Sequence, residues 1–173
     1  MTTAKPIGST RSIKSSYVLP PDTNNHNTLF GGNLMAYIDD VGARAAMRHS
    51  RRPVVTASTD SIDFLHPIKV DHEVTLVAVV TWTRTTSMEV FIRVVSEDLH
   101  TGERIVCATS FLTYVALGDD GRPVEVPKVF PETPEERLLH EGAPARAEAR
   151  RQRRVVSKSL AESLGTKMPW EKD

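Results

Sequence analysis

The order of the periodic segments constrains the fold more than any other feature of this 173-residue sequence. Residues 32–49 repeat apolar side chains with the 3.6-residue period of an amphipathic helix. One segment before this helix and four after it are rich in the residues that favour strands, at 11–19, 54–66, 73–83, 88–97 and 104–117. One long helix packed on a mainly antiparallel sheet buries both apolar faces, so the sequence predicts an α+β fold.

The apolar content predicts one domain with appendages. With 39% hydrophobic residues, the chain can bury one substantial core. Residues 1–10 are polar and expected to be flexible, and the globular unit spans 11–122. Residues 123–173 are proline-rich and then charged, with one short helix, and either wrap the domain or are disordered. The run VTLVAVV at 74–80 is apolar on both alternating sets, so the second face of the sheet is also expected to be covered, for example by a second subunit.

The charge balance argues against nucleic acid and membrane partners. Twenty-two basic and 22 acidic side chains cancel. The basic run RAEARRQRR has no interleaved aromatic residues and is typical of a solvated helix end. No apolar run approaches the ~20 residues of a membrane helix, and the polar start lacks the apolar segment of a secretory signal. We expect a cytoplasmic protein in which the single cysteine, Cys107, is a buried thiol.

Two adjacent aspartates occupy different positions around the predicted helix. With residues placed every ~100° from Leu34, Asp40 lies near 240°, beside the opposite charge of Arg44. Asp39 lies near ~140°, at the edge of the apolar stripe, with Ala43 rather than a cation one turn on. Partly apolar surroundings raise the proton affinity of a carboxylate, so Asp39 is a candidate base or nucleophile, or else a boundary residue that reaches water. The stripe itself comprises Leu34, Met35, Ile38, Val41, Gly42, Ala45 and Ala46.

The glycine pair Gly31-Gly32 begins this helix, where free amide protons meet the positive end of the helix dipole. Because glycine lacks a Cβ, a ligand can approach the backbone there closely. The free amides can then stabilise an oxyanion or bind a phosphate. The alternative is that the two glycines only allow a tight loop to enter the helix. Gly32 and Asp39 are roughly 10 Å apart along the axis, whereas a reacting carbon must lie within ~3–3.5 Å of its nucleophile. We therefore expect two subunits with antiparallel helices to share a site at their interface.

Other catalytic constellations are not indicated. The six histidines are scattered without a short ligand spacing, so no metal site is expected. The sequence has no G-x-S-x-G motif, and Cys107 lies within an apolar strand segment, which disfavours a serine or cysteine nucleophile.

Four stretches together resemble the hotdog-fold acyl-CoA thioesterases, in particular the bacterial acyl-CoA hydrolases related to cytosolic long-chain acyl-CoA thioesterases. They are DTNNHNTLFGGNLMAYIDD, ASTDSIDFLHPIKVDHEV, TRTTSMEVFIRV and FLTYVALGDDGRPVEVP, which cover about residues 11–125 in order. The resemblance implies a hotdog fold, in which an antiparallel sheet wraps a long central helix, paired into double-hotdog dimers that often form trimers of dimers. It also implies hydrolysis of acyl-CoA to a free acid and CoA, with CoA bound as part of the substrate and no separate cofactor.

The resemblance also assigns roles to residues. Asp39 is the acidic residue of the central helix, acting as base for water or as nucleophile, and an amide of Gly32 or Gly31 faces the thioester oxygen. Several relatives have a catalytic asparagine four residues before the second glycine, where this sequence has Thr28, so that role falls to Thr28 or to Asn24. Thr59, on the strand facing the helix, is expected to line the acyl or pantetheine path. The segment TRTTSMEV at 83–90 resembles the segment that meets the nucleotide end of CoA. The expected substrate contacts are Phe30, Gly31, Thr59, Arg84, Thr86 and Ser87.

Two rival functions come from other classes. One is a non-catalytic acyl-CoA-binding or sensing module on the same fold. The other is an assembly or nucleic-acid-binding role carried by the basic tail.

Overall fold

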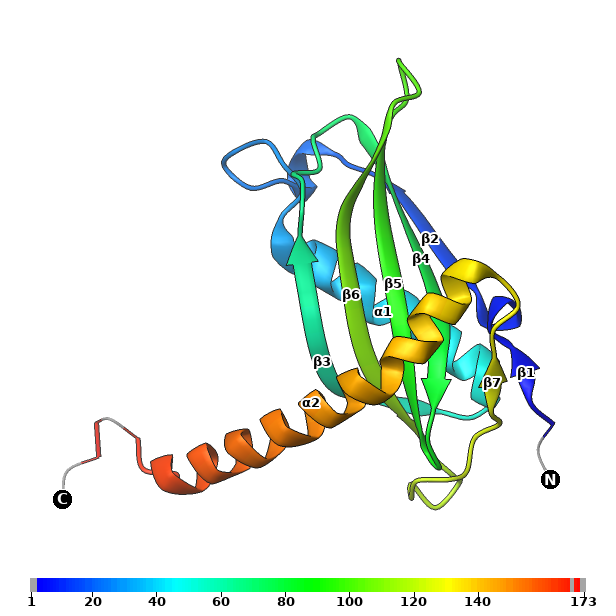
Figure 1. Ribbon diagram of the computed structural model, residues 1–173. Helices are drawn as coiled ribbons and strands as arrows, with labels where there is room; N and C mark the ends of the chain where they lie inside the picture. The colour runs from blue at the N-terminus through cyan, green and yellow to red at the C-terminus, as the bar shows by residue number, and fades with distance from the viewer. Residues whose placement is uncertain (1–2, 169, 172–173) are drawn as a thin grey trace.

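The structure is a computed structural model that describes residues 3–168 and 170–171. Its centre is a five-stranded antiparallel sheet in the order β2-β4-β5-β6-β3, with helix α1 across one face (Figure 1). The bounds are Gly31–Ser50 for α1, Ser12–Tyr17 for β2, Val54–Phe64 for β3, His72–Thr83 for β4, Ser87–Asp98 for β5 and Arg104–Ala116 for β6. Every bound lies within two residues of the sequence prediction, and the predicted α+β class is confirmed.

The connections explain the strand order. Tight turns join β4 to β5 and β5 to β6, so these three strands form consecutive antiparallel hairpins. In the second turn Gly102 has a φ of +75°, and Oδ1 of Asp98 accepts a hydrogen bond from the His100 amide. Strand β3 follows α1 and pairs with β6, which leaves β3 as one edge of the sheet.

The core lies between α1 and the sheet. The hydrophobic residues on the buried side of the helix join buried strand residues in one cluster. The buried side comprises Leu34, Ile38, Val41, Gly42, Ala45, Ala46 and His49. This is the predicted stripe with two differences. His49, which the predicted stripe did not include, is also buried. Met35, expected within the stripe, is 47% exposed, because its edge of the helix turns away from the sheet.

Residues before the predicted domain start also enter the fold. Strand β1 (Lys5–Pro6) pairs in parallel with β7 (Val129–Phe130), and a 3-10 helix follows at Ile7–Thr10. Ile7 is fully buried, and Oγ1 of Thr10 accepts a hydrogen bond from the amide of Val80 at 2.8 Å. Residues 5–10, expected to be flexible, therefore contribute to the buried unit, which begins before residue 11.

The C-terminal extension forms a second long helix. Helix α2 (Pro134–Leu164) has 31 residues, whereas the sequence suggested a short helix. It begins with a capping box, in which Thr133 accepts a hydrogen bond from the amide of Glu136 and Glu136 accepts one from the amide of Thr133. The helix crosses the face of the sheet opposite α1 and then projects past β3 (Figure 1). The second face is thus covered in part by the chain's own helix.

Candidate active site

Asp39 lies on the exposed edge of α1, and two hydroxyl groups hold it there. Its Oδ1 accepts a hydrogen bond of 2.7 Å from Oγ1 of Thr56 on β3. The hydroxyl of Tyr114 on β6 lies 3.0 Å from the main-chain oxygen of Asp39 and 3.2 Å from its Oδ1, and it donates to one or the other. Within the described part of the chain, Oδ2 of Asp39 has no hydrogen-bond partner, so this oxygen is available to a substrate or to water.

The adjacent aspartate has a different environment. Asp40 forms ion pairs with Lys14 at 3.1 Å and with Arg44 at 3.0 Å, which confirms the predicted contact with Arg44. Burial alone would raise the pKa of Asp40, but the hydrogen bonds from these two cations hold it below its usual value. No such cation pairs with Asp39 among the residues that the structure describes. Of the two carboxylates, Asp40 is neutralised in a structural contact and Asp39 is left open.

Tyr114 fixes the position of Asp39 from below the helix. Its ring is fully buried, and a Cβ at Gly42 would collide with its hydroxyl, so glycine at this position lets the hydroxyl reach α1. Burial, and then the negative charge of Asp39, raise the pKa of the Tyr114 phenol above its usual value. Tyr114 therefore stays protonated and acts as a hydrogen-bond donor.

Neither Thr56 nor Tyr114 was predicted from the sequence as a site residue. They are cross-strand partners in the register of β3 and β6. Both are ordinary strand residues in sequence, and their side-chain directions follow from a strand register that local patterns do not specify.

The loop before α1 brings Asn24 and Thr28 together. Nδ2 of Asn24 donates to Oγ1 of Thr28 at 3.0 Å, and Oδ1 of Asn24 accepts from the amide of His26 at 2.9 Å. The loop turns at Asn27, whose φ is +57°. Both predicted side chains thus take part in local loop bonding, and both line a cavity of about 420 Å³ that also contains Gly31 and Leu34.

The glycine pair lies at the entrance of the helix, as predicted. Helix α1 has no side-chain cap at Phe30, so no side chain there occupies the first-turn amides of Gly31 and Gly32. The exposed ring of Phe30 lies directly over Gly32, where a Cβ would collide with it. Asp39 does not line the cavity at this turn. One chain therefore does not bring its own glycine turn and aspartate into a single pocket.

A second cavity, of about 470 Å³, lies between the outer face of the sheet and α2. It contains three of the predicted substrate contacts, Thr59, Arg84 and Ser87. Thr86 belongs to the same turn but does not line the cavity. Thr59 was expected to face the central helix; it lies in this outer cavity instead, and Thr56 makes the contact with α1. The remaining lining residues are Ala57, Ser58, Thr113, Val115, Ala147, Arg150, Arg151, Arg153, Arg154 and Ser157.

The arginines around this second cavity are only partly neutralised. Arg150 and Arg153 of α2 both contact Asp60 of β3, at 2.5 and 2.7 Å. Arg84 and Arg154 form no ion pair with any residue in the described portion of the chain. The cavity therefore has positive charge available for an anionic group.

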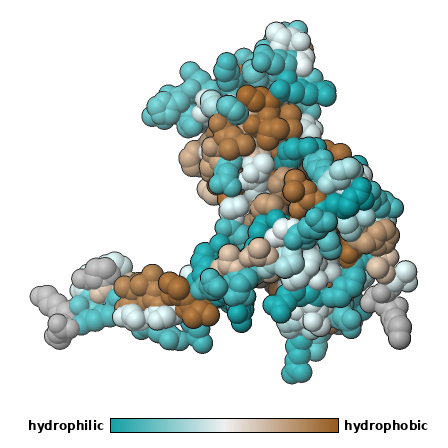
Figure 2. All heavy atoms as spheres, in the orientation of Figure 1, coloured by the Kyte–Doolittle hydropathy of each residue, from teal (hydrophilic) through white to brown (hydrophobic). Residues whose placement is uncertain are grey.

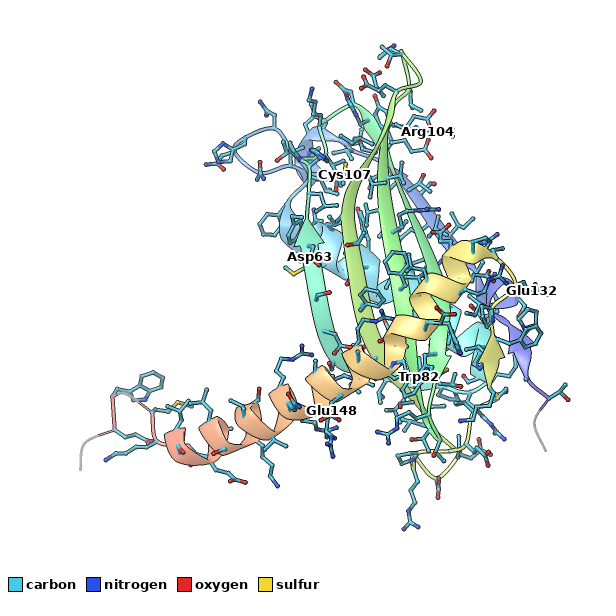
Figure 3. The ribbon with its side chains drawn as sticks, viewed as in Figure 1. Asp63, Trp82, Arg104, Cys107, Glu132 and Glu148 are labelled. Carbon is cyan, nitrogen blue, oxygen red and sulfur yellow. The ribbon has the colours of Figure 1, made fainter. Side chains whose placement is uncertain are left out.

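The described residues include no cluster of three or more histidine, cysteine, aspartate or glutamate side chains that could hold a metal ion. None of the described helices has the length and apolar character required to cross a membrane. Cys107 lies on β6 (Figure 3), and burial raises the pKa of its thiol, which makes it a poor nucleophile.

Comparison with known proteins gives a consistent assignment. A model of the thioesterase superfamily matches residues 26–103. The chain is 57% identical to the uncharacterized acyl-CoA thioester hydrolase YkhA of Bacillus subtilis, over 91% of this chain and 92% of that protein. The acyl-CoA hydrolase of Staphylococcus aureus, solved with butyryl coenzyme A, coenzyme A and coenzyme A disulfide, is 44% identical, with a TM-score of 0.90 over 94% of this chain and 99% of that one. An apo-hexameric acyl-CoA thioesterase is 48% identical, with a TM-score of 0.86 over 87% and 97% of the two chains.

The chain therefore belongs to the thioesterase superfamily, among its hotdog-fold acyl-CoA hydrolases. The hotdog fold implied by the sequence resemblance is confirmed. Three further structures of the S. aureus hydrolase carry alanine in place of an aspartate, a threonine or an asparagine, and the asparagine variant was solved with coenzyme A.

Proposed function

We propose that this chain hydrolyses acyl-CoA thioesters to a free carboxylic acid and CoA, at a site where Asp39 of one subunit faces the glycine turn of another. The observation that carries the proposal is the environment of the Asp39 carboxylate. One of its oxygens accepts hydrogen bonds from hydroxyl groups, and the other has no hydrogen-bond partner among the described residues. The relatives that act on acyl-CoA support the substrate class.

The variant structures of the S. aureus hydrolase support the choice of residues. Their asparagine, aspartate and threonine positions are separated by intervals of 15 and 17 residues. Asn24, Asp39 and Thr56 have the same residue types in the same order, at the same intervals of 39 − 24 = 15 and 56 − 39 = 17. This match favours Asn24 over Thr28 as the polar loop residue of the site.

The chemistry follows from the groups present. Asp39 takes a proton from water, whose oxygen attacks the thioester carbonyl, or it attacks that carbon directly. The carbonyl oxygen becomes an oxyanion, which the amides of Gly31 and Gly32 stabilise at the positive end of the α1 dipole. The C–S bond then breaks, and the CoA thiolate takes up the proton that Asp39 removed from water. If Asp39 attacks directly, this cleavage leaves a mixed anhydride on Asp39, and water hydrolyses the anhydride to the free acid, the restored carboxylate and the proton that the thiolate takes up. Thr56 and Tyr114 orient the carboxylate throughout.

The pairing of two subunits would bring the glycine turn of one close to Asp39 of the other. Strand β3 is an edge of the sheet, with Val55 46% and Phe64 57% exposed, and α1 exposes Met35 and Met47 on its free side. Antiparallel pairing of β3 with β3 of a second copy extends the sheet and places the two α1 helices side by side in opposite directions. The glycine turn of each copy then approaches Asp39 of the other. The hexameric relative is consistent with assembly of such dimers into a trimer of dimers.

The turn between β4 and β5 is suited to the nucleotide end of CoA. Arg84 and Thr86 lie in this turn and Ser87 begins β5, and Arg84 and Ser87 border the arginine-rich cavity. Ser87 pairs with Val115 of β6, and the next residue, Met88, pairs with Tyr114, whose hydroxyl contacts Asp39. The turn is therefore close to the cross-strand row that contacts Asp39. The phosphates can bind at the turn while the pantetheine passes round this end of the sheet. The proposal includes no separate cofactor and no nucleic acid partner, and it places the protein in the cytoplasm.

The test is hydrolysis of a panel of acyl-CoAs, followed with a thiol reporter. We expect Asp39→Asn to reduce turnover by about a thousandfold, because it removes the base or nucleophile. Asp40→Asn is the matched control and should keep most of the activity, since Asp40 is held in ion pairs with Lys14 and Arg44. Sedimentation should show the same assembly for both variants. Tight CoA binding by the wild-type chain without turnover would favour a sensing module, and an active Asp39→Asn variant would contradict the assigned role.

A further inference from the structure

We infer that the cavity beside the glycine turn holds the acyl chain of the substrate and selects unbranched aliphatic chains of medium length. This cavity, called the acyl cavity below, is lined by residues between 24 and 34 and by residues 64–68. The inference rests on the proposed hydrolysis of acyl-CoA and adds the class of acyl group that the site accepts.

Most of the lining of the acyl cavity is apolar. Leu29, Leu34 and Ile68 belong to the buried core and are 7%, 3% and 4% exposed. Phe64 and Leu65, at the end of β3 and just after it, line the same cavity but are 57% and 53% exposed. Figure 2 shows hydrophobic residues gathered near the tip of β3. A cavity with a buried apolar lining and an exposed apolar rim is suited to an aliphatic ligand.

The polar part of the lining lies beside the amides assigned to the thioester oxygen. Asn24, Thr28 and Gly31 line the acyl cavity together with its apolar residues. The ring of Phe64 is close to Gly31, because a Cβ at this glycine would lie 4.0 Å from Cζ of Phe64. A carbonyl oxygen at the Gly31 amide would therefore have apolar surface next to it for the aliphatic tail. This order of polar and apolar groups matches the two ends of an acyl group.

The proposed pairing of two β3 strands places the acyl cavity beside the carboxylate of the second copy. Antiparallel pairing puts the end of one β3 that carries Phe64 beside the N-terminal half of the other β3, which carries Thr56. Phe64 pairs with Ala108 of the core, so its ring is on the α1 face of the sheet. On this face Thr56 contacts Asp39. A chain in the acyl cavity of one copy thus ends at a carbonyl near Asp39 of the other.

The cavity between the sheet and α2 is unsuited to the acyl chain. It is lined by Arg84 and by four arginines of α2. An aliphatic chain among these guanidinium groups would remove them from water without giving them hydrogen-bond partners, which costs free energy. The two cavities therefore correspond to the two ends of acyl-CoA, with the phosphates at the arginines and the acyl chain beside the glycine turn.

The volume of the acyl cavity sets the length that it accepts. The cavity has about 420 Å³. At roughly 30 Å³ per carbon, which is the share of one water molecule in the liquid, this volume holds up to about 14 carbons. Each methylene that leaves water for apolar surface improves binding by up to about fourfold. Shorter chains leave part of the cavity unfilled, and the carbons of longer chains that extend beyond it gain nothing further.

The first measurement is the dependence of kcat/KM on chain length for the wild-type protein, from butyryl-CoA to stearoyl-CoA. We expect kcat/KM to rise by about twofold to fourfold for each methylene between butyryl-CoA and octanoyl-CoA. The rise should end between dodecanoyl-CoA and stearoyl-CoA. Equal kcat/KM values from butyryl-CoA to dodecanoyl-CoA would overturn the inference and leave the proposed hydrolysis standing.

Variants of Leu65 test whether this cavity is the cause. Leu65→Trp fills part of the cavity and Leu65→Gln makes its rim polar, so each should lower the ratio of kcat/KM for dodecanoyl-CoA over butyryl-CoA at least about tenfold. Leu99→Trp is the matched control, because Leu99 is 50% exposed and does not line the cavity. It should leave the ratio unchanged. A wild-type ratio in both Leu65 variants would contradict the assignment of the cavity.

Binding of S-alkyl-CoA thioethers, which cannot be hydrolysed, separates this inference from the proposed function. In calorimetry the wild-type protein should bind S-dodecyl-CoA at least about a hundredfold more tightly than S-butyl-CoA, and Leu65→Trp should reduce this difference. Such a preference in a chain that hydrolyses no acyl-CoA would support the acyl cavity and count against the proposed function alone. Hydrolysis without any effect of chain length on rate or binding would count against the acyl cavity alone, and a chain that binds neither thioether and hydrolyses nothing would overturn both.

Discussion

At the scale of single residues, the site depends on which groups contact Asp39. A carboxylate on a surface helix is normally free to sample several rotamers. Here Thr56 and Tyr114 reach it from two neighbouring strands and hold one oxygen, so the other keeps a constant direction. Orientation of the reacting oxygen lowers the entropy cost of reaching the transition state.

This orientation predicts the effect of changing Thr56. Thr56→Val keeps the shape of the side chain but removes the donor to Asp39, so we expect kcat to fall by about tenfold to a hundredfold, with a smaller change in KM. Thr56→Ser keeps the hydroxyl and is the matched control, expected to retain most of the activity. Steady-state kinetics with one acyl-CoA would measure both. Equal kcat values for the valine and serine variants would contradict a positioning role.

At the scale of elements, α2 is attached to the sheet mainly through charged groups. The side chain of Glu89 on β5 is fully buried and accepts hydrogen bonds from Thr81 at 2.8 Å and from Arg146 at 2.9 Å. The guanidinium of Arg146 also lies 4.2 Å from the centre of the Phe111 ring. A buried carboxylate of this kind is acceptable only because its partners are in place, so the sheet and the helix position each other.

Removing one partner of this pair should therefore be costly. We expect Arg146→Met to lower the free energy of unfolding by about 3 kcal/mol, because it leaves Glu89 buried with fewer donors. The double variant Arg146→Met with Glu89→Met should recover part of that loss, since it replaces both charges with apolar groups. Chemical denaturation of the three proteins would give the comparison. If the double variant is less stable than Arg146→Met, the stability of α2 does not depend on this pair in the way described.

At the scale of the whole molecule, the main consequence is that one chain is incomplete. The glycine turn borders one cavity, and Asp39 lies further along the same rigid helix, outside that cavity. No movement within a helix can close such a gap, so the proposed function requires that the second half of the site comes from another copy.

A mixing experiment follows from this geometry. Gly32→Val should block the oxyanion position in one chain, and Asp39→Asn should remove the carboxylate in another, so each homodimer should be inactive. After subunit exchange at equal concentrations, half of the dimers are mixed, and each has one site with both native residues. We expect the mixture to regain about a quarter of the wild-type activity per subunit. No recovery after proven exchange would indicate that each chain contains its own complete site.

The sequence by itself determined the central helix, the five strands of the main sheet, the fold class and the candidate carboxylate of the proposed site. The helix and strand bounds, the pairing of Asp40 with Arg44 and the exposed position of Asp39 follow from helical and strand periodicity, which is a local property. The roles of Thr56 and Tyr114, the burial of Ile7 and the course of α2 were decided by the tertiary structure. Each of these depends on strand register or on contacts between segments far apart in the chain. A one-residue shift in the register of β3, for example, would turn Thr56 to the opposite face of the sheet, away from Asp39.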